Sequence, residues 1–255
     1  MKVTIDDKID VFYRIKGNDQ GFPVIFIHGL AGDSRFFHSQ LNYFGESNKT
    51  IAIDLPAHGR SSYITEPSVS LYNKSIDAVV EKEKIDSYIL AGHSMGGAVS
   101  IENYLRNRDR VKALILISTS YSFHITKKLM DAVTDDFDNL FDKIFPRIFH
   151  KKFSIFMSAA KTNLSEEHKK IIKADLLLCS KINYDKQLAD INIPVLLVAN
   201  KLDRMIPAYL TEEMHWKIKN SKLAIFDDEG HVPFFENSNE FNSAVDEFIR
   251  SIQWS

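Results

Sequence analysis

Cysteine is almost absent from the sequence. Cys179 is the only one among 255 residues, so no intrachain disulfide can form. A chain without disulfides is typical of a reducing compartment, and we therefore predict a cytoplasmic protein. Cys179 itself is expected to be a small buried or half-buried apolar residue, because no catalytic motif surrounds it.

Long apolar runs and charge of one sign are also scarce. The longest apolar segments, such as residues 113–117, are of strand length and far too short to cross a bilayer. The first residues contain no apolar core of signal-peptide length, so we expect a soluble protein without a membrane span. The 34 acidic residues nearly balance the 32 basic ones, for a formal net charge of −2. A basic field of the kind that nucleic-acid binding needs is therefore not indicated.

Motifs for cofactors and metals are missing as well. The G-x-G-x-x-G pattern of dinucleotide binding and the P-loop pattern do not occur. No cluster of histidine, aspartate and glutamate has the spacing of a metal site. The sequence therefore predicts neither a cofactor nor a metal ion, and we expect the protein's own side chains to carry its chemistry.

What the sequence does contain is a regular alternation of strand and helix patterns. Short apolar runs predict strands at residues 3–5, 9–15, 24–27, 51–53, 87–90, 111–117, 194–199 and 222–226, the first two of which should form a hairpin. Amphipathic stretches predict helices near residues 34–44 and at about 71–84, 95–106, 208–219 and 238 onward. This alternation predicts an α/β fold in which helices flank a mostly parallel sheet of eight strands.

The alternation stops between residues 119 and 190, where the sequence becomes helical and unusually aromatic. We expect an inserted helical subdomain there, with a core domain formed by residues 1–118 and 191–255. One helix of the insert is predicted to start at Asn163 or Ser165. Its apolar side is expected to comprise Ile171, Ile172, Leu176 and Leu177.

Phenylalanines recur at every fourth position in this insert, beginning with Phe137 and Phe141, and Phe156 follows further on. Their spacing by itself favours packing in a core. The alternative is that part of this series covers a binding cavity, because ligand pockets are mostly apolar. Phe137, Phe141 and Phe156 are therefore candidate substrate-binding residues.

One serine lies between glycines directly after a predicted strand. Residues 92–96 read G-H-S-M-G, a spacing typical of a sharp turn from strand to helix that holds the serine strained and exposed. A neutral hydroxyl is a poor nucleophile, so Ser94 needs a base within hydrogen-bonding reach. Asp203 and His231 each follow a later predicted strand. Because open α/β sheets build their sites at the carboxyl ends of strands, these three residues are candidate catalytic residues.

The order of these segments resembles the α/β-hydrolase family over essentially the whole chain. His28-Gly29 comes first, then the serine motif, then Asp203, then Gly230-His231, and the order Ser, Asp, His is the one that this fold uses. Residues 54–61, D-L-P-A-H-G-R-S, also resemble a family segment whose first glycine is replaced here by an alanine at position 57. The insert lies between the sixth and seventh strands, where the family carries its cap.

The resemblance implies a role for each residue of the site. Ser94 would be the nucleophile, His231 the general base, and Asp203 the acid that orients the histidine. The backbone N–H groups of Leu30 and Met95 would form the oxyanion hole. Residues 118–120 offer no carboxylate after the sixth strand, whereas Asp227 and Asp228 remain alternatives for the acid.

Three further histidines stand near these motifs, at positions 28, 58 and 93. We expect them to shape the loops or the pocket and not to bind a metal. His28 and His93 are in addition candidate substrate-binding residues, because each lies next to a segment that the resemblance places at the site.

The nucleophile determines the class of reaction. Serine favours acyl transfer to water from esters, thioesters, lactones or amides. Relatives that open epoxides or displace halide use aspartate instead, which argues against those activities. Carbon–carbon bond hydrolases also use serine, but they tend to carry a Gly-Pro-Gly-like sequence where residues 30–32 read L-A-G.

We therefore predict hydrolysis of small to medium carboxylic esters, with a small-molecule ester as the substrate. A carbon–carbon bond hydrolase, a thioesterase and a lactonase are the alternatives. A different class stays open, because some proteins with this fold bind a small ligand and signal while retaining the triad. The sequence does not indicate whether the protein is a monomer or a homodimer.

Overall fold

The computed structural model describes residues 1–19, 21–135 and 165–252. An eight-stranded sheet lies at its centre, with the strand order β1-β2-β4-β3-β5-β6-β7-β8. The strands are β1 (Lys2–Ile5), β2 (Ile9–Lys16), β3 (Val24–Ile27), β4 (Thr50–Ile53), β5 (Tyr88–His93), β6 (Val111–Ile117), β7 (Val195–Asn200) and β8 (Ser221–Phe226). The β1–β2 and β2–β4 pairs are antiparallel, and the pairs from β4 through β8 are parallel. The predicted α/β fold with a mostly parallel eight-stranded sheet is confirmed.

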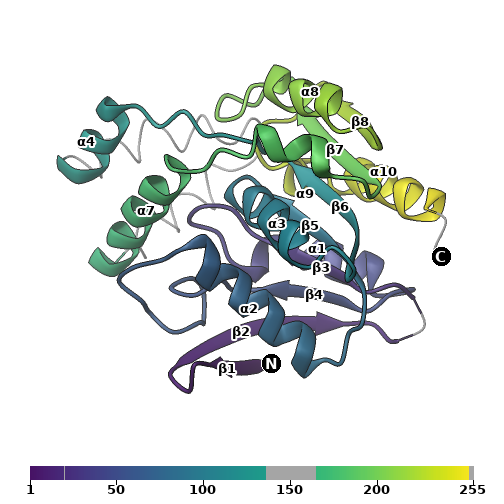
Figure 1. Cartoon of the computed structure of the whole chain (residues 1–255), viewed down its shortest axis with the longest axis horizontal. Helices are drawn as coiled ribbons and strands as arrows, with labels where there is room; N and C mark the ends of the chain where they lie inside the picture. Colours follow the sequence, from purple (N-terminus) through teal and green to yellow (C-terminus); the bar gives the residue numbers. More distant parts are fainter. Residues whose placement is uncertain (20, 136–164, 253–255) are drawn as a thin grey trace.

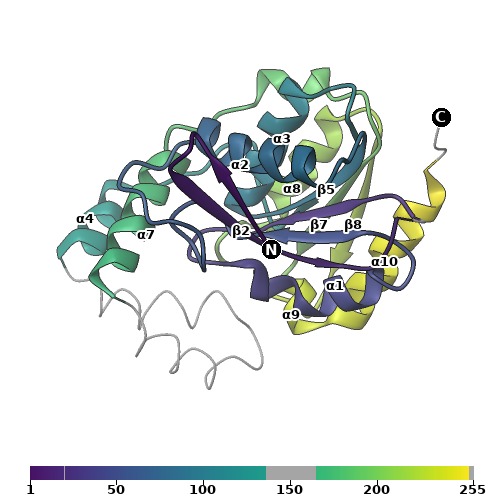
Figure 2. The same ribbon diagram turned by 90° about the horizontal axis from the view of Figure 1, so that it is seen from below.

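Helices cover both faces of the sheet. One face is covered by α2 (Val69–Lys82), α3 (Met95–Arg106) and α8 (Ala208–Lys217). The other face is covered by α1 (His38–Phe44), which follows the short 3₁₀ helix η1 (Ser34–Phe37), and by α9 (Pro233–Glu236) and α10 (Ser238–Ser251) (Figure 2). Every parallel strand therefore needs apolar side chains on both of its sides.

The central strand β3 shows how the core is divided. Val24 and Phe26 pack into the cluster that includes α1 and α10, whereas Ile25 and Ile27 pack into the cluster that includes α2 and α3. Successive side chains of a strand point to opposite faces, and all four are fully buried. The uninterrupted apolar run in the sequence is thus the consequence of two cores, one on each side of the sheet.

Several element boundaries differ from the sequence prediction by a few residues, and two of them have a clear cause. Helix α2 begins at Val69 instead of residue 71, because the Ser68 side chain accepts a hydrogen bond from the backbone N–H of Leu71 and caps the helix. Strand β5 continues to His93 instead of ending at residue 90, because its register with β6 runs on to the pair His93–Ile117. The strand therefore reaches the serine turn itself.

Two helices of the segment between β6 and β7 lie side by side, away from the layers of the sheet (Figures 1 and 2). They are α4 (Lys127–Asp135) and α7 (Glu166–Cys179), and the 3₁₀ helix η2 (Lys186–Asp190) leads back to β7. Ser165 caps α7, as one of the two sequence alternatives has it. Ile171, Ile172 and Leu176 are buried as predicted, but Leu177 is 43% exposed. The prediction for Leu177 was wrong because, at about 100° per residue, this side chain points to the side of α7 opposite the buried Ile171, Asp175 and Cys179.

Three further predictions from the sequence concern Cys179, membrane-spanning helices and the phenylalanines of the insert. Cys179 is buried, as expected for a small apolar residue. Among the helices of the described ranges, none is long and apolar enough to cross a membrane. Phe137, Phe141 and Phe156, the candidate pocket residues of the aromatic insert, lie outside the described residues.

Candidate active site

Ser94 occupies the turn between β5 and α3 in a strained backbone conformation. Its φ of 53° and ψ of −121° are rarely adopted by a residue with a side chain. Neighbouring segments hold this turn, because the Ser94 N–H donates to the carbonyl of Ile117 at 2.9 Å and the Thr119 hydroxyl donates to the Ser94 carbonyl at 2.7 Å. Ser94 is the N-cap residue of α3, yet its side chain makes no capping hydrogen bond. Its half-buried hydroxyl is therefore not engaged in holding the helix.

Glycines allow the loop after β3 to approach this turn closely. A Cβ atom on Gly96 would lie 2.4 Å from the carbonyl oxygen of Ile27, and one on Gly29 would lie 2.9 Å from Cβ of Ser94. Neither position has room for a larger residue. The loop that continues into Leu30 therefore lies against the serine turn, after which α3 begins at Met95. The first N–H groups of a helix have no intrahelical acceptor, so Met95 can donate to an anion here.

His231 is hydrogen bonded to a buried carboxylate. Its ring Nδ1 lies 2.8 Å from Oδ2 of Asp203, whose side chain is fully buried. The other oxygen of Asp203 accepts the backbone N–H groups of Met205 and Ile206 at 2.8 and 2.9 Å, which fixes the carboxylate plane. Because a carboxylate accepts, Nδ1 carries the proton, and Nε2 of the neutral ring is free to accept one.

Asp203 is thus the carboxylate that faces the ring of His231. Asp227, one of the alternatives for the acid, forms a surface ion pair with Lys201 at 2.7 Å, and its side chain is 74% exposed. At the end of β6, where a carboxylate is missing from the sequence, the Ser118 hydroxyl accepts from the Asn200 side chain at 2.7 Å. That contact joins the ends of β6 and β7, from which the loop carrying Asp203 departs.

His93 links the serine turn to the loop that carries His231. The two imidazole rings lie with their centroids 4.7 Å apart, and Nε2 of His93 lies 2.8 Å from the carbonyl oxygen of His231. His93 directly precedes Ser94, so this contact brings the serine turn and the His231 loop to the same edge of the sheet. A direct hydrogen bond between the Ser94 hydroxyl and His231 is not formed within the described residues.

The backbone on either side of His231 is held by Glu236 of α9. The N–H groups of Gly230 and Val232 donate to the two carboxylate oxygens of Glu236 at 3.0 and 3.2 Å. The sequence prediction did not include Glu236, because a glutamate five residues after a histidine carries no local signal of this contact.

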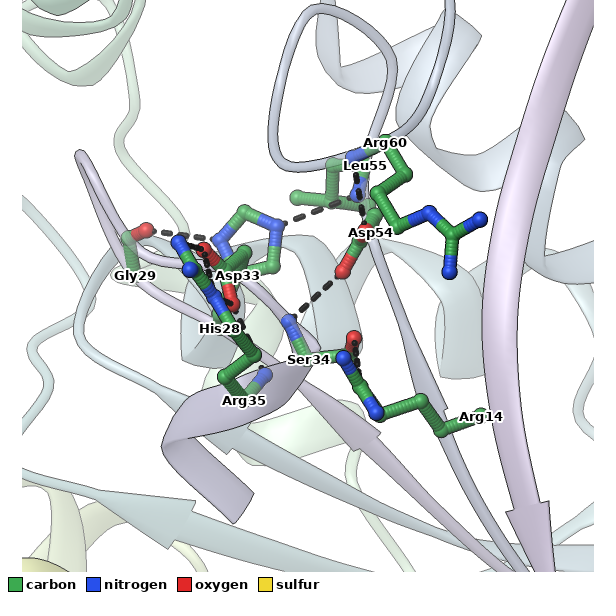
Figure 3. Close-up of polar contacts among 9 residues, drawn as sticks. All are labelled: Arg14, His28, Gly29, Asp33, Ser34, Arg35, Asp54, Leu55 and Arg60. Atoms are coloured by element: carbon green, nitrogen blue, oxygen red, sulfur yellow. Dashed lines mark hydrogen bonds and ion pairs between the residues drawn. The ribbon is translucent and has the colours of Figure 1, made fainter. Parts of the chain in front are cut away.

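His28 stabilises the loop that carries Leu30 (Figure 3). Its Nδ1 donates to the carbonyl of Gly29 at 2.8 Å, and its Nε2 accepts the backbone N–H of Leu55 at 3.0 Å. Burial lowers the pKa of His28 to about 4, with a further contribution from nearby His58, so the ring stays neutral. Since main-chain groups occupy both ring nitrogens, this geometry supports a loop-shaping role.

Asp54 holds the same loop from the other side (Figure 3). Its two carboxylate oxygens accept the backbone N–H groups of Ser34 at 2.7 Å and Arg60 at 2.8 Å. The loop after β3 is therefore connected by His28 and Asp54 to the loop after β4. These contacts hold the loop that includes Leu30 in place.

A second buried charge pair joins α7 to the loop after β4. Nε2 of His58 lies 2.9 Å from Oδ2 of Asp175, at an angle outside that of a hydrogen bond, and the Tyr72 hydroxyl donates to Oδ1 of Asp175 at 2.6 Å. Nδ1 of His58 donates to the carbonyl of Pro56 at 3.1 Å. Burial alone would lower the pKa of His58, but the Asp175 carboxylate outweighs it and raises the pKa above its ordinary value.

The sequence prediction missed Asp175, although a signal for it exists. Asp175 lies on the inner side of α7 between the buried residues Ile171, Ile172 and Leu176, and its own side chain is fully buried. A carboxylate on the apolar side of an amphipathic helix needs a partner. That partner, His58, was predicted only to shape its own loop.

Apolar side chains surround the loop that carries Leu30. Leu30 and Ala31 pack against residues of α4 and α7 and of the segment before α4. The cluster comprises Ile125, Leu129, Met130, Val133, Ile172 and Leu176. No group of three or more His, Cys, Asp or Glu side chains that could hold a metal ion occurs in the described part of the chain.

Comparisons with known proteins agree with this fold. Residues 23–177 match the family model described as alpha/beta hydrolase fold, and residues 175–254 match one described as TAP-like protein. The AB hydrolase superfamily protein YisY of Bacillus subtilis is 28% identical over 98% of both chains. A pimeloyl-(acyl-carrier protein) methyl ester esterase of Legionella pneumophila is 25% identical over 91% of this chain and 96% of its own. A thermophilic esterase from Thermogutta terrifontis has the same fold, with a TM-score of 0.86 at 19% identity over 98% of this chain and 97% of its own.

Proposed function

Because the chain belongs to the α/β-hydrolase family, we propose that it is a serine hydrolase that cleaves small to medium carboxylic esters. The observation that carries the proposal is the buried hydrogen bond between His231 and Asp203, formed beside the strained turn that presents Ser94. A neutral histidine with its Nδ1 proton held by a carboxylate is the base that a serine nucleophile needs. The relatives named as esterases support an ester as the substrate.

The proposed reaction has two steps. Nε2 of His231 takes the hydroxyl proton of Ser94 as its Oγ attacks the ester carbonyl, and the N–H groups of Leu30 and Met95 stabilise the oxyanion. The intermediate expels the alcohol, which takes the proton from His231, and leaves an acyl-enzyme. Water then attacks the acyl carbon with His231 again as the base, and Ser94 regains its proton when the acid leaves. Asp203 stabilises the imidazolium in both steps.

The apolar surroundings of Leu30 support an apolar acyl or alcohol group. Side chains of α4 and α7 pack around the loop that supplies one oxyanion donor, and none of those in the cluster is charged. We further propose that residues 119–190 form a helical cap over this edge and that residues 1–118 and 191–255 form the core domain. The position of α4 and α7 away from the sheet supports this division (Figure 1).

The test is turnover of a chain-length series of p-nitrophenyl esters, from acetate to decanoate, by the purified protein. We expect steady-state hydrolysis with a preference for the shorter and middle chain lengths. Replacing Ser94 by alanine should lower kcat by at least about 10³-fold, because the covalent route is lost. The control is Ser70→Ala, which changes an exposed serine of α2 and should leave kcat unchanged. Unchanged turnover in Ser94→Ala would refute the mechanism.

The same assay separates the alternative functions. Thioesters and lactones are also cleaved through an acyl-enzyme. A substrate panel that includes both therefore shows, by the values of kcat/KM, whether esters, thioesters or lactones are preferred. A β-diketone in the panel tests carbon–carbon bond hydrolysis. For a ligand-binding signalling protein we would expect one slow acylation of Ser94 without turnover, which intact-mass spectrometry would detect as a single persistent acyl adduct.

A further inference from the structure

The short segment around His231 lies outside any helix or strand, and side chains hold its backbone. The flanking N–H groups of Gly230 and Val232 donate hydrogen bonds to the carboxylate of Glu236. The carbonyl oxygen of His231 itself accepts a hydrogen bond from Nε2 of His93 at 2.8 Å. Polar backbone groups in a buried loop need partners, and the partner of this carbonyl comes from the residue that directly precedes Ser94.

The chemistry of the contact fixes the state of His93. Because a carbonyl oxygen only accepts, Nε2 of His93 must carry the proton. Nδ1 of the same ring is buried without a hydrogen-bond partner, and it faces Gly29, where an added Cβ would lie 2.9 Å away. Burial lowers the pKa of His93 well below its ordinary value, and neighbouring His231 lowers it further. His93 is thus a neutral donor throughout the pH range in which His231 would work as a base.

We propose that His93 is a positioning residue that holds the peptide of His231 by this hydrogen bond and so sets the base relative to Ser94. The inference rests on the proposed function, in which His231 is the base. The end of β5 then positions both Ser94 and His231. The backbone of His93 continues into the serine turn, and the side chain of His93 reaches the loop of His231. A displacement of a reacting group by about 1 Å can lower a rate about 10²-fold, so a loop without this anchor is expected to be slow.

Packing alone is the competing explanation, because the ring of His93 also contacts Phe234 with centroids 5.0 Å apart. Two substitutions separate the two roles. His93→Gln keeps a donor, since its amide nitrogen is three bonds from Cβ, as Nε2 is in histidine. His93→Phe keeps an aromatic ring against Phe234 but removes the donor.

Ester turnover, its pH profile and the melting temperature are to be measured for both variants and the wild type. We expect His93→Phe to lower kcat about 10- to 100-fold with KM changed less than about threefold, because the base is displaced while substrate binding remains. The acidic limb of its kcat/KM profile should also shift, because that limb reports the free enzyme's base. His93→Gln should recover most of kcat and the wild-type profile.

The proposal is overturned if His93→Phe retains the wild-type kcat and pH profile. It is equally overturned if folded His93→Gln is as slow as His93→Phe, since the donor would then be irrelevant and packing would explain the role. A measurement on the wild-type protein keeps the proposal testable if a variant does not fold. Nitrogen-15 NMR of the histidine rings should show His93 as the neutral Nε2–H form from pH 5.5 to 8.5, and the Nδ1–H form would refute the contact.

Failure of the proposed function would look different. In that case the wild type would not turn over any ester in the series, and Ser94 would not react with a fluorophosphonate probe. Two NMR observations do not depend on turnover. One is the tautomer of the His93 ring, and the other is the downfield resonance of the proton between Nδ1 of His231 and Asp203. We expect this proton in the wild type and in His93→Gln but not in His93→Phe, whatever the substrate is.

Discussion

Replacing Asp175 by asparagine is expected to destabilise the protein and to reverse how its stability changes with pH near neutrality. The Asp175 side chain is fully buried on α7, where it accepts from the Tyr72 hydroxyl at 2.6 Å and faces Nε2 of His58 at 2.9 Å. Asparagine has nearly the same shape and can still accept from Tyr72. The substitution therefore removes the charge while leaving the volume in place.

In the wild type, the pKa of His58 is raised above its ordinary value of 6.5, because Asp175 outweighs the effect of burial. A group whose pKa is raised on folding contributes stability that is fully present below its unfolded pKa of 6.5. That contribution is lost as the pH rises through the folded pKa. Asp54 raises the pKa of His58 further, and the ring of His28, whose own pKa is lowered, lies 4.8 Å from the ring of His58.

In Asp175→Asn, burial dominates and the pKa of His58 falls below 6.5, so the contribution of His58 to stability is lost as the pH falls. Removal of one partner of a buried ion pair costs about 3–5 kcal/mol when the other must stay charged. Because His58 can become neutral in the variant, this range of about 3–5 kcal/mol is the upper limit of the loss that we expect near pH 5.5. Near pH 8.5 His58 is neutral and can accept from the new amide, so the loss should shrink to about 1–2 kcal/mol.

The assay is urea unfolding followed by far-UV circular dichroism at pH values from 5.5 to 8.5. The matched control is Asp131→Asn in α4, which removes an exposed carboxylate that pairs with Lys127. Such an exposed pair contributes little to stability, so the control should follow the wild type. If Asp175→Asn loses stability with rising pH in parallel with the wild type, the assignment of the charge pair is refuted.

Four further substitutions test the segments around the site. Gly96→Ala should cost about 1–3 kcal/mol of stability, measured by urea unfolding, because its Cβ would lie 2.4 Å from the Ile27 carbonyl; stability within 0.5 kcal/mol of the wild type would contradict this. Ala57→Gly should stabilise the protein by up to about 1 kcal/mol, because Ala57 has a strained φ of 70° that glycine adopts freely. Gly59→Ala should destabilise the protein, because it places a side chain at a φ of 55°. Equal effects of the two substitutions on stability would refute the strain argument. Glu236→Gln should lower kcat/KM about 10-fold in the ester assay, because the new amide NH₂ group would face the backbone N–H of Gly230 or Val232. Wild-type kinetics would show that the loop around His231 does not need the carboxylate.

Several features of this protein follow from the sequence alone, because they depend on neighbours in the chain. The apolar runs of β3 and β6 predict strands buried on both faces, and each run occupies one strand of the structure. The spacing of glycines around Ser94 predicts a sharp turn, and the turn has the strained φ that such a motif needs. Helix α3 was predicted with its observed bounds, because it begins where that turn ends.

The tertiary structure decided which distant groups meet. The hydrogen bond from His93 to the His231 carbonyl spans 138 residues, and the one from Tyr72 to Asp175 spans 103. No periodicity or local motif encodes contacts of this kind, since they depend on how loops from different strands pack at one edge. The extension of β5 to His93 is likewise set by a neighbouring element, because it follows the pairing with β6.

The candidate site therefore has two origins. The sequence alone determined the chemical groups, since Ser94, Asp203 and His231 stand after strands in an order that predicts one sheet edge. Only the folded chain decided how they are held: Asp203 by two backbone N–H groups, and the peptide of His231 by the His93 side chain. The physical reason is that residue types and local spacing specify which bonds can form. Long-range packing determines which of them do form, and at what distance.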